Sequence, residues 1–214
     1  MNAINQLSIL KITFLTVIAL CTFAANSVIC RLALESGLID PSSYTSIRLL
    51  SGTFALMILV RLGSSTESMD KKGSWSGGLT LFIYACTLSY AYISLDTATG
   101  ALILFGAVQL TIMFISIIKG EKISALEWLG ITIAFCGFVY LVWPLMSEPS
   151  FKGAILMVIS GITWGLYTLI GKGSRRPLID TCYNFVRTIP FVILLFLLTF
   201  FENLGIKKSG YSTS

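Results

Sequence analysis

The sequence predicts an all-α membrane protein of about seven transmembrane helices. Its 214 residues are 55% hydrophobic and only 12% charged, whereas soluble proteins average about 25% charged residues. The apolar residues also gather into long runs, each bounded by a few polar or charged side chains. A helical run of about 20 apolar residues crosses a hydrocarbon core about 30 Å thick. The chain therefore has the composition and the run lengths of a multi-pass membrane protein.

Seven helices can be placed along the chain. The start of the second is marked by Asp40-Pro41-Ser42, because proline suits the first turn of a helix, where its missing N–H has no partner. A polar linker, 62–74, precedes the third helix, and Pro144 ends the fifth. The expected helices span residues 12–33, 41–60, 75–95, 97–118, 126–143, 153–171 and 183–201.

An internal repeat relates the first two predicted helices to the last two. In the first and sixth helices, Ala19, Thr22 and Asn26 correspond to Ser160, Thr163 and Tyr167 at a constant spacing of 141 residues. Tyr44-x-x-x-Arg48 in the second helix likewise corresponds to Tyr183-x-x-x-Arg187 in the seventh. Because an odd number of helices separates the copies, they run oppositely through the membrane. This pattern is typical of an inverted repeat, whose interface commonly holds a substrate site.

Two adjacent stretches carry a resemblance to a known family. Residues 120–142, GEKISALEWLGITIAFCGFVYLV, resemble the closing hairpin of an EamA-type half in the drug/metabolite transporter superfamily. Residues 100–111, GALILFGAVQLT, resemble one branch of that family. The resemblance covers nearly the whole chain, from about residue 7 to residue 201. It implies a fold of ten helices in two inverted five-helix halves, and transport of small metabolites.

Compared with that family pattern, the chain is shorter. Residues 9–146 form a complete first five-helix repeat, residues 151–202 form the first two helices of the inverted second half, and residues 203–214 form a polar tail. Three explanations are open: a frameshifted remnant, a partial sequence, or a subunit completed by a second chain or by itself. We expect the shortened chain not to transport alone, because a cavity between the halves would have one wall.

Small and polar side chains form stripes on one face of four otherwise apolar helices. Lipid cannot satisfy such groups, so they should face inward and line a cavity with neutral hydrogen-bonding groups and aromatic walls. Gln109, at the centre of its helix, carries a large amide that needs several partners. The alternative is close helix packing, which Gly161-x-x-x-Gly165 would also allow. The predicted substrate-binding residues are Thr22, Asn26, Thr87, Gln109, Thr163, Trp164 and Tyr167.

Arg48 and Arg187 each lie about one turn into their helices. A guanidinium there can extend along its apolar stem to the head-group level of the bilayer. Alternatively, it can act as a gate or as a charge facing anions near the mouth of the cavity. The sequence leaves both interpretations open.

Several function classes are disfavoured by what the sequence lacks. It contains no histidine, and its five cysteines lie mostly inside apolar runs without a CxxC motif, so we expect no metal site. No Asp or Glu falls in the middle of a predicted helix, and no glycine-rich phosphate loop is present. We therefore predict no enzyme activity and no cofactor. The net charge is +5. The basic residues lie between the apolar runs, where they set the topology of the chain in the membrane and do not indicate nucleic-acid binding.

The sequence thus predicts a transporter that moves small polar metabolites, such as amino-acid-like compounds, by alternating access. The expected partners are the lipid bilayer and a small-molecule substrate. With the N-terminus inside, Lys and Arg divide nine to five in favour of the inner side, with Arg187 unassigned. We therefore expect a cytoplasmic (inner) membrane protein with a cytoplasmic N-terminus and a cytoplasmic 62–74 linker. The alternative function is a non-transporting remnant or an accessory membrane subunit.

Overall fold

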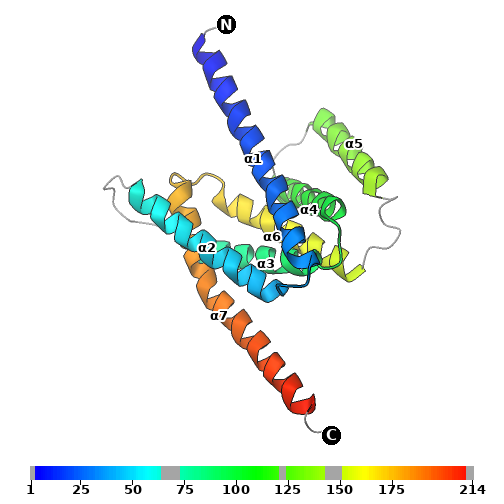
Figure 1. Cartoon of the computed structure of the whole chain (residues 1–214). Helices are drawn as coiled ribbons and strands as arrows, with labels where there is room; N and C mark the ends of the chain where they lie inside the picture. Colours follow the sequence, from blue (N-terminus) through cyan, green and yellow to red (C-terminus); the bar gives the residue numbers. More distant parts are fainter. Residues whose placement is uncertain (1–2, 64–72, 121–123, 143–150, 211–214) are drawn as a thin grey trace.

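The computed structural model describes residues 3–63, 73–120, 124–142 and 151–210, and all regular structure in these ranges is helical. The all-α prediction is therefore confirmed for the described residues (Figure 1). The helices are α1 (Ala3–Glu35), α2 (Pro41–Leu62), α3 (Trp75–Ala91), α4 (Thr97–Ile118), α5 (Ala125–Val142), α6 (Phe151–Gly171) and α7 (Pro177–Gly210).

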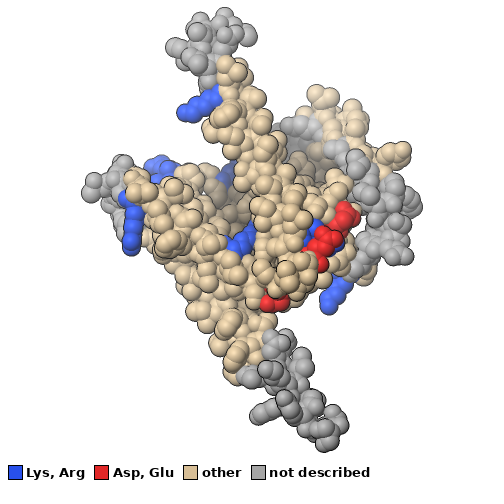
Figure 2. All heavy atoms as spheres, viewed as in Figure 1, with Lys and Arg blue, Asp and Glu red and all other residues tan. Residues whose placement is uncertain are grey.

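Five of the described helices are long and apolar enough to cross a membrane: α1, α2, α4, α6 and α7. Helix α3 has 17 residues and rises only about 26 Å, slightly less than a typical hydrocarbon core. The apolar stretch found in α5, Trp128–Gly137, is shorter. Figure 2 shows a largely uncharged surface, with Lys, Arg, Asp and Glu at a few places. The chain is an integral membrane protein, and the count of seven spans stays a prediction.

Polar N-cap side chains set the start of three helices. Asp40, Ser74 and Asp96 each accept a hydrogen bond from the backbone N–H three residues later, at 2.9 Å in every case. These bonds satisfy N–H groups that the first turn of a helix leaves without partners. The predicted range 97–118 agrees with the observed α4 at both ends.

The predicted start of the seventh helix, at residue 183, was wrong. Helix α7 begins at Pro177, because proline at the first position and Asp180 in the first turn both suit a helix N-terminus. It also continues to Gly210, past the predicted end at 201 and into the segment predicted as a polar tail. Residues 211–214, most of the predicted 62–74 linker and the predicted stop at Pro144 lie outside the described residues.

Helix α6 packs against both α3 and α4, and glycine permits its close approach to α4. A Cβ placed on Gly161 would lie 2.5 Å from the Ala107 Cβ and 2.6 Å from the Leu104 carbonyl oxygen. A Cβ on Gly165 would lie 3.0 Å from the Thr111 Cβ. The Gly161-x-x-x-Gly165 pair therefore serves helix packing, as the small-residue alternative predicts.

Buried hydroxyl groups join α3 to its neighbours. Thr45 Oγ1 on α2 donates to Ser89 Oγ on α3 at 2.8 Å, and Ser160 Oγ on α6 donates to the Tyr84 carbonyl oxygen at 3.1 Å. Helix α7 packs across α2 and α3. Helix α3 is therefore the central element, and its neighbours α2, α6 and α7 surround it.

Helix α1 is held mainly through its C-terminal part. Arg31 Nη1 donates to the carbonyl oxygens of Tyr92 at 2.7 Å and Ile93 at 3.2 Å, at the C-terminal end of α3. A cation is favoured there by the unpaired carbonyls and by the helix dipole. Figure 1 shows α1 and α7 extending from the central group in opposite directions, with the chain ends far apart.

Candidate functional site

A partly enclosed cavity of ≈ 280 Å³ lies among α2, α3, α6 and α7. Its size is just below the roughly 300–1,000 Å³ of pockets for drug-sized ligands, so it suits a metabolite. The four helices contribute one charged group, several aromatic rings and a few aliphatic side chains. The lining residues are Arg48, Leu49, Leu81, Tyr84, Ala85, Trp164, Tyr167, Thr181 and Phe185.

Arg48 supplies the only charge among the described residues that line the cavity. Its Nη2 donates to the Tyr84 hydroxyl at 3.1 Å, and its guanidinium carbon lies 5.2 Å from the centre of the Tyr84 ring. Its Nη1 is buried and has no hydrogen-bond partner among the described residues. Of the two interpretations left open by the sequence, this geometry favours a charge that faces the cavity over one that reaches for the head groups.

Three aromatic side chains of the cavity form a continuous row. The ring centroids of Tyr84 and Trp164 are 4.5 Å apart, and those of Trp164 and Tyr167 are 5.4 Å apart. Phe23 of α1 extends the row, with its centroid 6.0 Å from Trp164. Closely spaced rings of this kind offer flat apolar faces to a ligand and hold one another in place.

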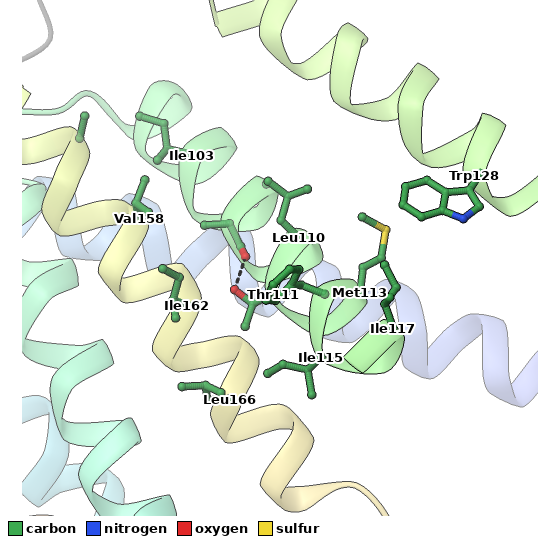
Figure 3. Close-up of a pocket in the computed structure, with 14 residues that line it drawn as sticks. Ile103, Leu110, Thr111, Met113, Ile115, Ile117, Trp128, Val158, Ile162 and Leu166 are labelled. Atoms are coloured by element: carbon green, nitrogen blue, oxygen red, sulfur yellow. Dashed lines mark hydrogen bonds between the residues drawn. The ribbon is translucent and has the colours of Figure 1, made fainter. Parts of the chain in front are cut away.

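A larger hollow, ≈ 750 Å³, lies between α4, α5 and α6 (Figure 3). Its side chains are almost all apolar, including Leu110, Met113 and Trp128. The Thr111 hydroxyl, its polar exception, donates to the Ala107 carbonyl oxygen at 2.7 Å within α4. This hollow lacks polar groups that would orient a solute, so we place the candidate site in the smaller cavity.

The structure brings two of the predicted site residues, Trp164 and Tyr167, together in the cavity lining. Thr163 is buried on the same helix, but its hydroxyl donates to the Ile159 and Ser160 carbonyls. Thr87 is half-buried and likewise donates within its helix, to the Ile83 carbonyl at 2.8 Å. Neither threonine is a lining residue of the cavity.

The other predicted residues do not reach the cavity lining. Asn26 is half-buried on α1, and Thr22 is exposed, with its hydroxyl donating to the Ile18 carbonyl at 2.8 Å. Gln109 is exposed on α4. It lies two residues, about 200° around the helix, from Ala107, which is buried. Neither Gln109 nor Asn26 is a lining residue of this cavity, and substrate binding by the seven residues stays a prediction.

Sequence reasoning did not select Arg48 or Tyr84 as binding residues. The signal for Arg48 was the Tyr44-x-x-x-Arg48 pattern, which recurs as Tyr183-x-x-x-Arg187. The two arginines have different surroundings, because the Arg187 guanidinium lies over the Trp75 ring, 5.8 Å from its centre. Sequence similarity between the copies therefore did not indicate which arginine faces the cavity.

The fold and the cavity define a multi-pass α-helical membrane protein with an internal hollow that is part aromatic and part cationic. An uncharacterized protein of Pseudomonas aeruginosa is 43% identical to the chain over 196 residues, which are 92% of this chain and 68% of that protein. The chain belongs to the family of this bacterial protein. An uncharacterized transporter of Archaeoglobus fulgidus is a distant homologue, 25% identical across 90% of this chain and 69% of its own length. No protein-family model matches the chain, and no solved structure matches it significantly.

Proposed function

We propose that this chain is a membrane transporter of small polar metabolites and that its substrate occupies the cavity among α2, α3, α6 and α7. The observation that carries the proposal is the cavity itself, in which Arg48 faces the row formed by Tyr84, Trp164 and Tyr167 inside a helical membrane protein. The distant archaeal homologue, named a transporter, supports the same class. The EamA-type resemblance and alternating access between inverted halves are parts of this proposal.

Transport is tested by measuring uptake of a labelled metabolite mixture in two preparations. One is liposomes containing the purified chain, and the other is membrane vesicles from cells that express it. Saturable uptake that falls at least about tenfold in Trp164→Ala supports the proposal, because that substitution removes the central ring of the cavity. Thr16→Ala is the matched control, since Thr16 is exposed, its hydroxyl donates within its own helix, and it is not a lining residue.

The two preparations separate the alternatives. Uptake by the purified chain contradicts the expectation that a second chain is needed. Uptake in membrane vesicles but not in liposomes supports a transporter that requires a partner. If neither preparation takes up any solute above protein-free controls, the proposal is wrong and an accessory, non-transporting role is favoured.

We also propose that the N-terminus is cytoplasmic and that the protein resides in the inner membrane. The distribution of Lys and Arg between the ends of the helices supports this orientation.

A further inference from the structure

We propose that the cavity selects small organic anions with a single carboxylate and a flat apolar body, and that Arg48 determines this specificity. The inference rests on the proposed function only in placing the substrate in this cavity. It adds the chemical class of the substrate and the role of one named residue.

The first argument is the missing countercharge of Arg48. The described residues that line the cavity include no Asp or Glu, and the salt bridge between Arg31 and Glu35 on α1 does not involve Arg48. A buried guanidinium is costly in a low-dielectric environment unless an opposite charge or several acceptors surround it. A bound carboxylate would supply that charge.

The second argument is the geometry of the guanidinium. One of its nitrogens, Nη2, is held at 3.1 Å by the Tyr84 hydroxyl, while the buried Nη1 has no partner within the described structure. An arginine held in this way presents donors in a fixed fork, which matches the two oxygens of a carboxylate. Tyr84 is therefore a positioning residue, and the guanidinium keeps a donor, Nη1, that no described residue accepts.

The third argument concerns the rest of the ligand. One cation on the lining matches one negative charge, so a doubly charged phosphate fits less well than a carboxylate. An amino-acid ammonium group would find no carboxylate among the described lining residues. The adjoining rings of Tyr84, Trp164 and Tyr167 instead offer flat faces to an apolar or aromatic body.

Fluorescence of Trp164 gives a direct test. Replacing Trp75, Trp128 and Trp143 by Phe leaves Trp164 as the only tryptophan, since the chain has four. This variant is placed in phosphatidylcholine nanodiscs, which contain no anionic lipid that could compete for Arg48. It is titrated with phenylacetate, with the neutral phenylacetamide and with the zwitterion phenylalanine.

We expect saturable quenching by phenylacetate, with at least about tenfold weaker binding of the amide and of the zwitterion, because a lost charged hydrogen bond changes affinity by this much or more. Arg48→Gln should weaken phenylacetate binding at least about tenfold, and Tyr84→Phe about fivefold, as expected for one neutral hydrogen bond. Arg48→Lys should fall between wild type and Arg48→Gln, because it keeps the charge but loses the fork. Arg61→Gln, in the exposed last turn of the same helix, is the control and should bind as wild type does.

Three results would overturn the inference: equal affinity for phenylacetate and its amide, unchanged phenylacetate affinity in both Arg48 variants, or no saturable quenching by any probe. If Arg48→Gln fails to fold, the comparison of carboxylate with amide in the parent variant and the Arg48→Lys and Tyr84→Phe titrations decide the question. Failure here leaves the proposed function intact if metabolite uptake is observed. Binding of phenylacetate without any metabolite uptake would contradict the proposed transport function but not the carboxylate specificity of the cavity.

Discussion

At the scale of single residues, hydrogen bonding separates side chains that need a ligand from those that do not. The hydroxyls of Thr22, Thr87 and Thr163 donate to carbonyls within their own helices. Such bonds satisfy a hydroxyl inside a membrane without any second helix or solute. The buried Nη1 of Arg48 has no equivalent bond among the described residues. The cavity chemistry is therefore concentrated in the guanidinium rather than in the threonines.

Asp96 gives a residue-scale prediction about pH. Burial raises the pKa of its carboxyl, but hydrogen bonds from the Thr99 N–H at 2.9 Å and the Thr99 hydroxyl at 2.7 Å outweigh burial and hold the pKa below 3.8. A lowered folded-state pKa means that the stabilisation is present above the unfolded value and is lost as pH falls through the folded one.

We therefore expect Asp96→Ala to lower the stability of the detergent-solubilised protein by about 1 kcal/mol at pH 7, and by less below pH 3.8. Thermal unfolding monitored by circular dichroism across pH 3 to 7 measures both effects. Asp96→Asn keeps the cap and serves as the control, with a smaller loss. A penalty for Asp96→Ala that stayed constant down to the lowest pH would contradict the role of the ionised carboxylate.

The sequence could predict which helix carries a residue, but not which other helices that residue faces. Trp164 and Tyr167 were predicted because they share one face of the sixth helix with its small and polar side chains, and the position of Tyr167 also recurs in the repeat. Gln109 was placed in the cavity because a large amide at a helix centre needs partners, yet it lies off the face that α4 turns toward α6. The face that a helix buries depends on which helices surround it, and an apolar helix of this kind has no strong pattern to indicate that face.

At the scale of the helices, close approach of α4 and α6 depends on glycine. In globular and membrane proteins alike, inserting atoms into a packed interface forces the backbones apart. At Gly161 the nearest atoms include the Leu104 carbonyl oxygen, which cannot rotate away as a side chain can.

Gly161→Ala should therefore destabilise the protein by about 1–3 kcal/mol, and Gly161→Leu by more. Gly130→Ala on α5 is the matched control, because nothing lies within 4 Å of a Cβ built there and alanine is the better helix former. Thermal unfolding in detergent compares the three variants with wild type. Equal melting temperatures for Gly161→Ala and Gly130→Ala would show that α4 and α6 are not in close contact.

Helix ends were predictable where a polar cap precedes an apolar run. The starts of α4 and α2 agree with the prediction. Asp96 is the N-cap of α4, and Asp40, followed by Pro41, is the N-cap of α2. The start of α7 was missed because the apolar run begins only after Asp180, although Pro177 already satisfies the geometry of a first turn. Hydropathy marks the segment that lipid surrounds, and the helix itself extends beyond that segment.

At the scale of the whole molecule, the distribution of basic residues predicts which end of each helix faces the cytoplasm. The asymmetry of Lys and Arg predicts that the C-terminal end of α2 is cytoplasmic and that the loop before α2 is on the other side. Leu62 and Leu38 are exposed positions at these two ends, with 81% and 87% of their surface accessible.

We expect Leu38→Cys, in a background whose five native cysteines are replaced by Ser, to react with a membrane-impermeant thiol reagent in intact cells. Leu62→Cys should react only after the cells are permeabilised. Labelling is measured by mass shift on a gel, and reaction of both cysteines in permeabilised cells is the control. The reverse pattern, with Leu62→Cys labelled in intact cells, would invert the proposed orientation.

The position of α6 has a consequence for how the protein is made. This helix, which leaves the ribosome after the first five, packs against both α3 and α4, and α7 then packs across α2 and α3. Membrane helices insert first and associate afterwards, so the earlier helices must stay in the bilayer with their interfaces open until α6 and α7 arrive. During that interval three features do not yet exist: the close approach of Gly161 to α4, the hydrogen bond from Ser160 to α3, and the cavity walls around Arg48 that α6 and α7 provide. Synthesis of the later segment therefore completes the core that the earlier segment begins.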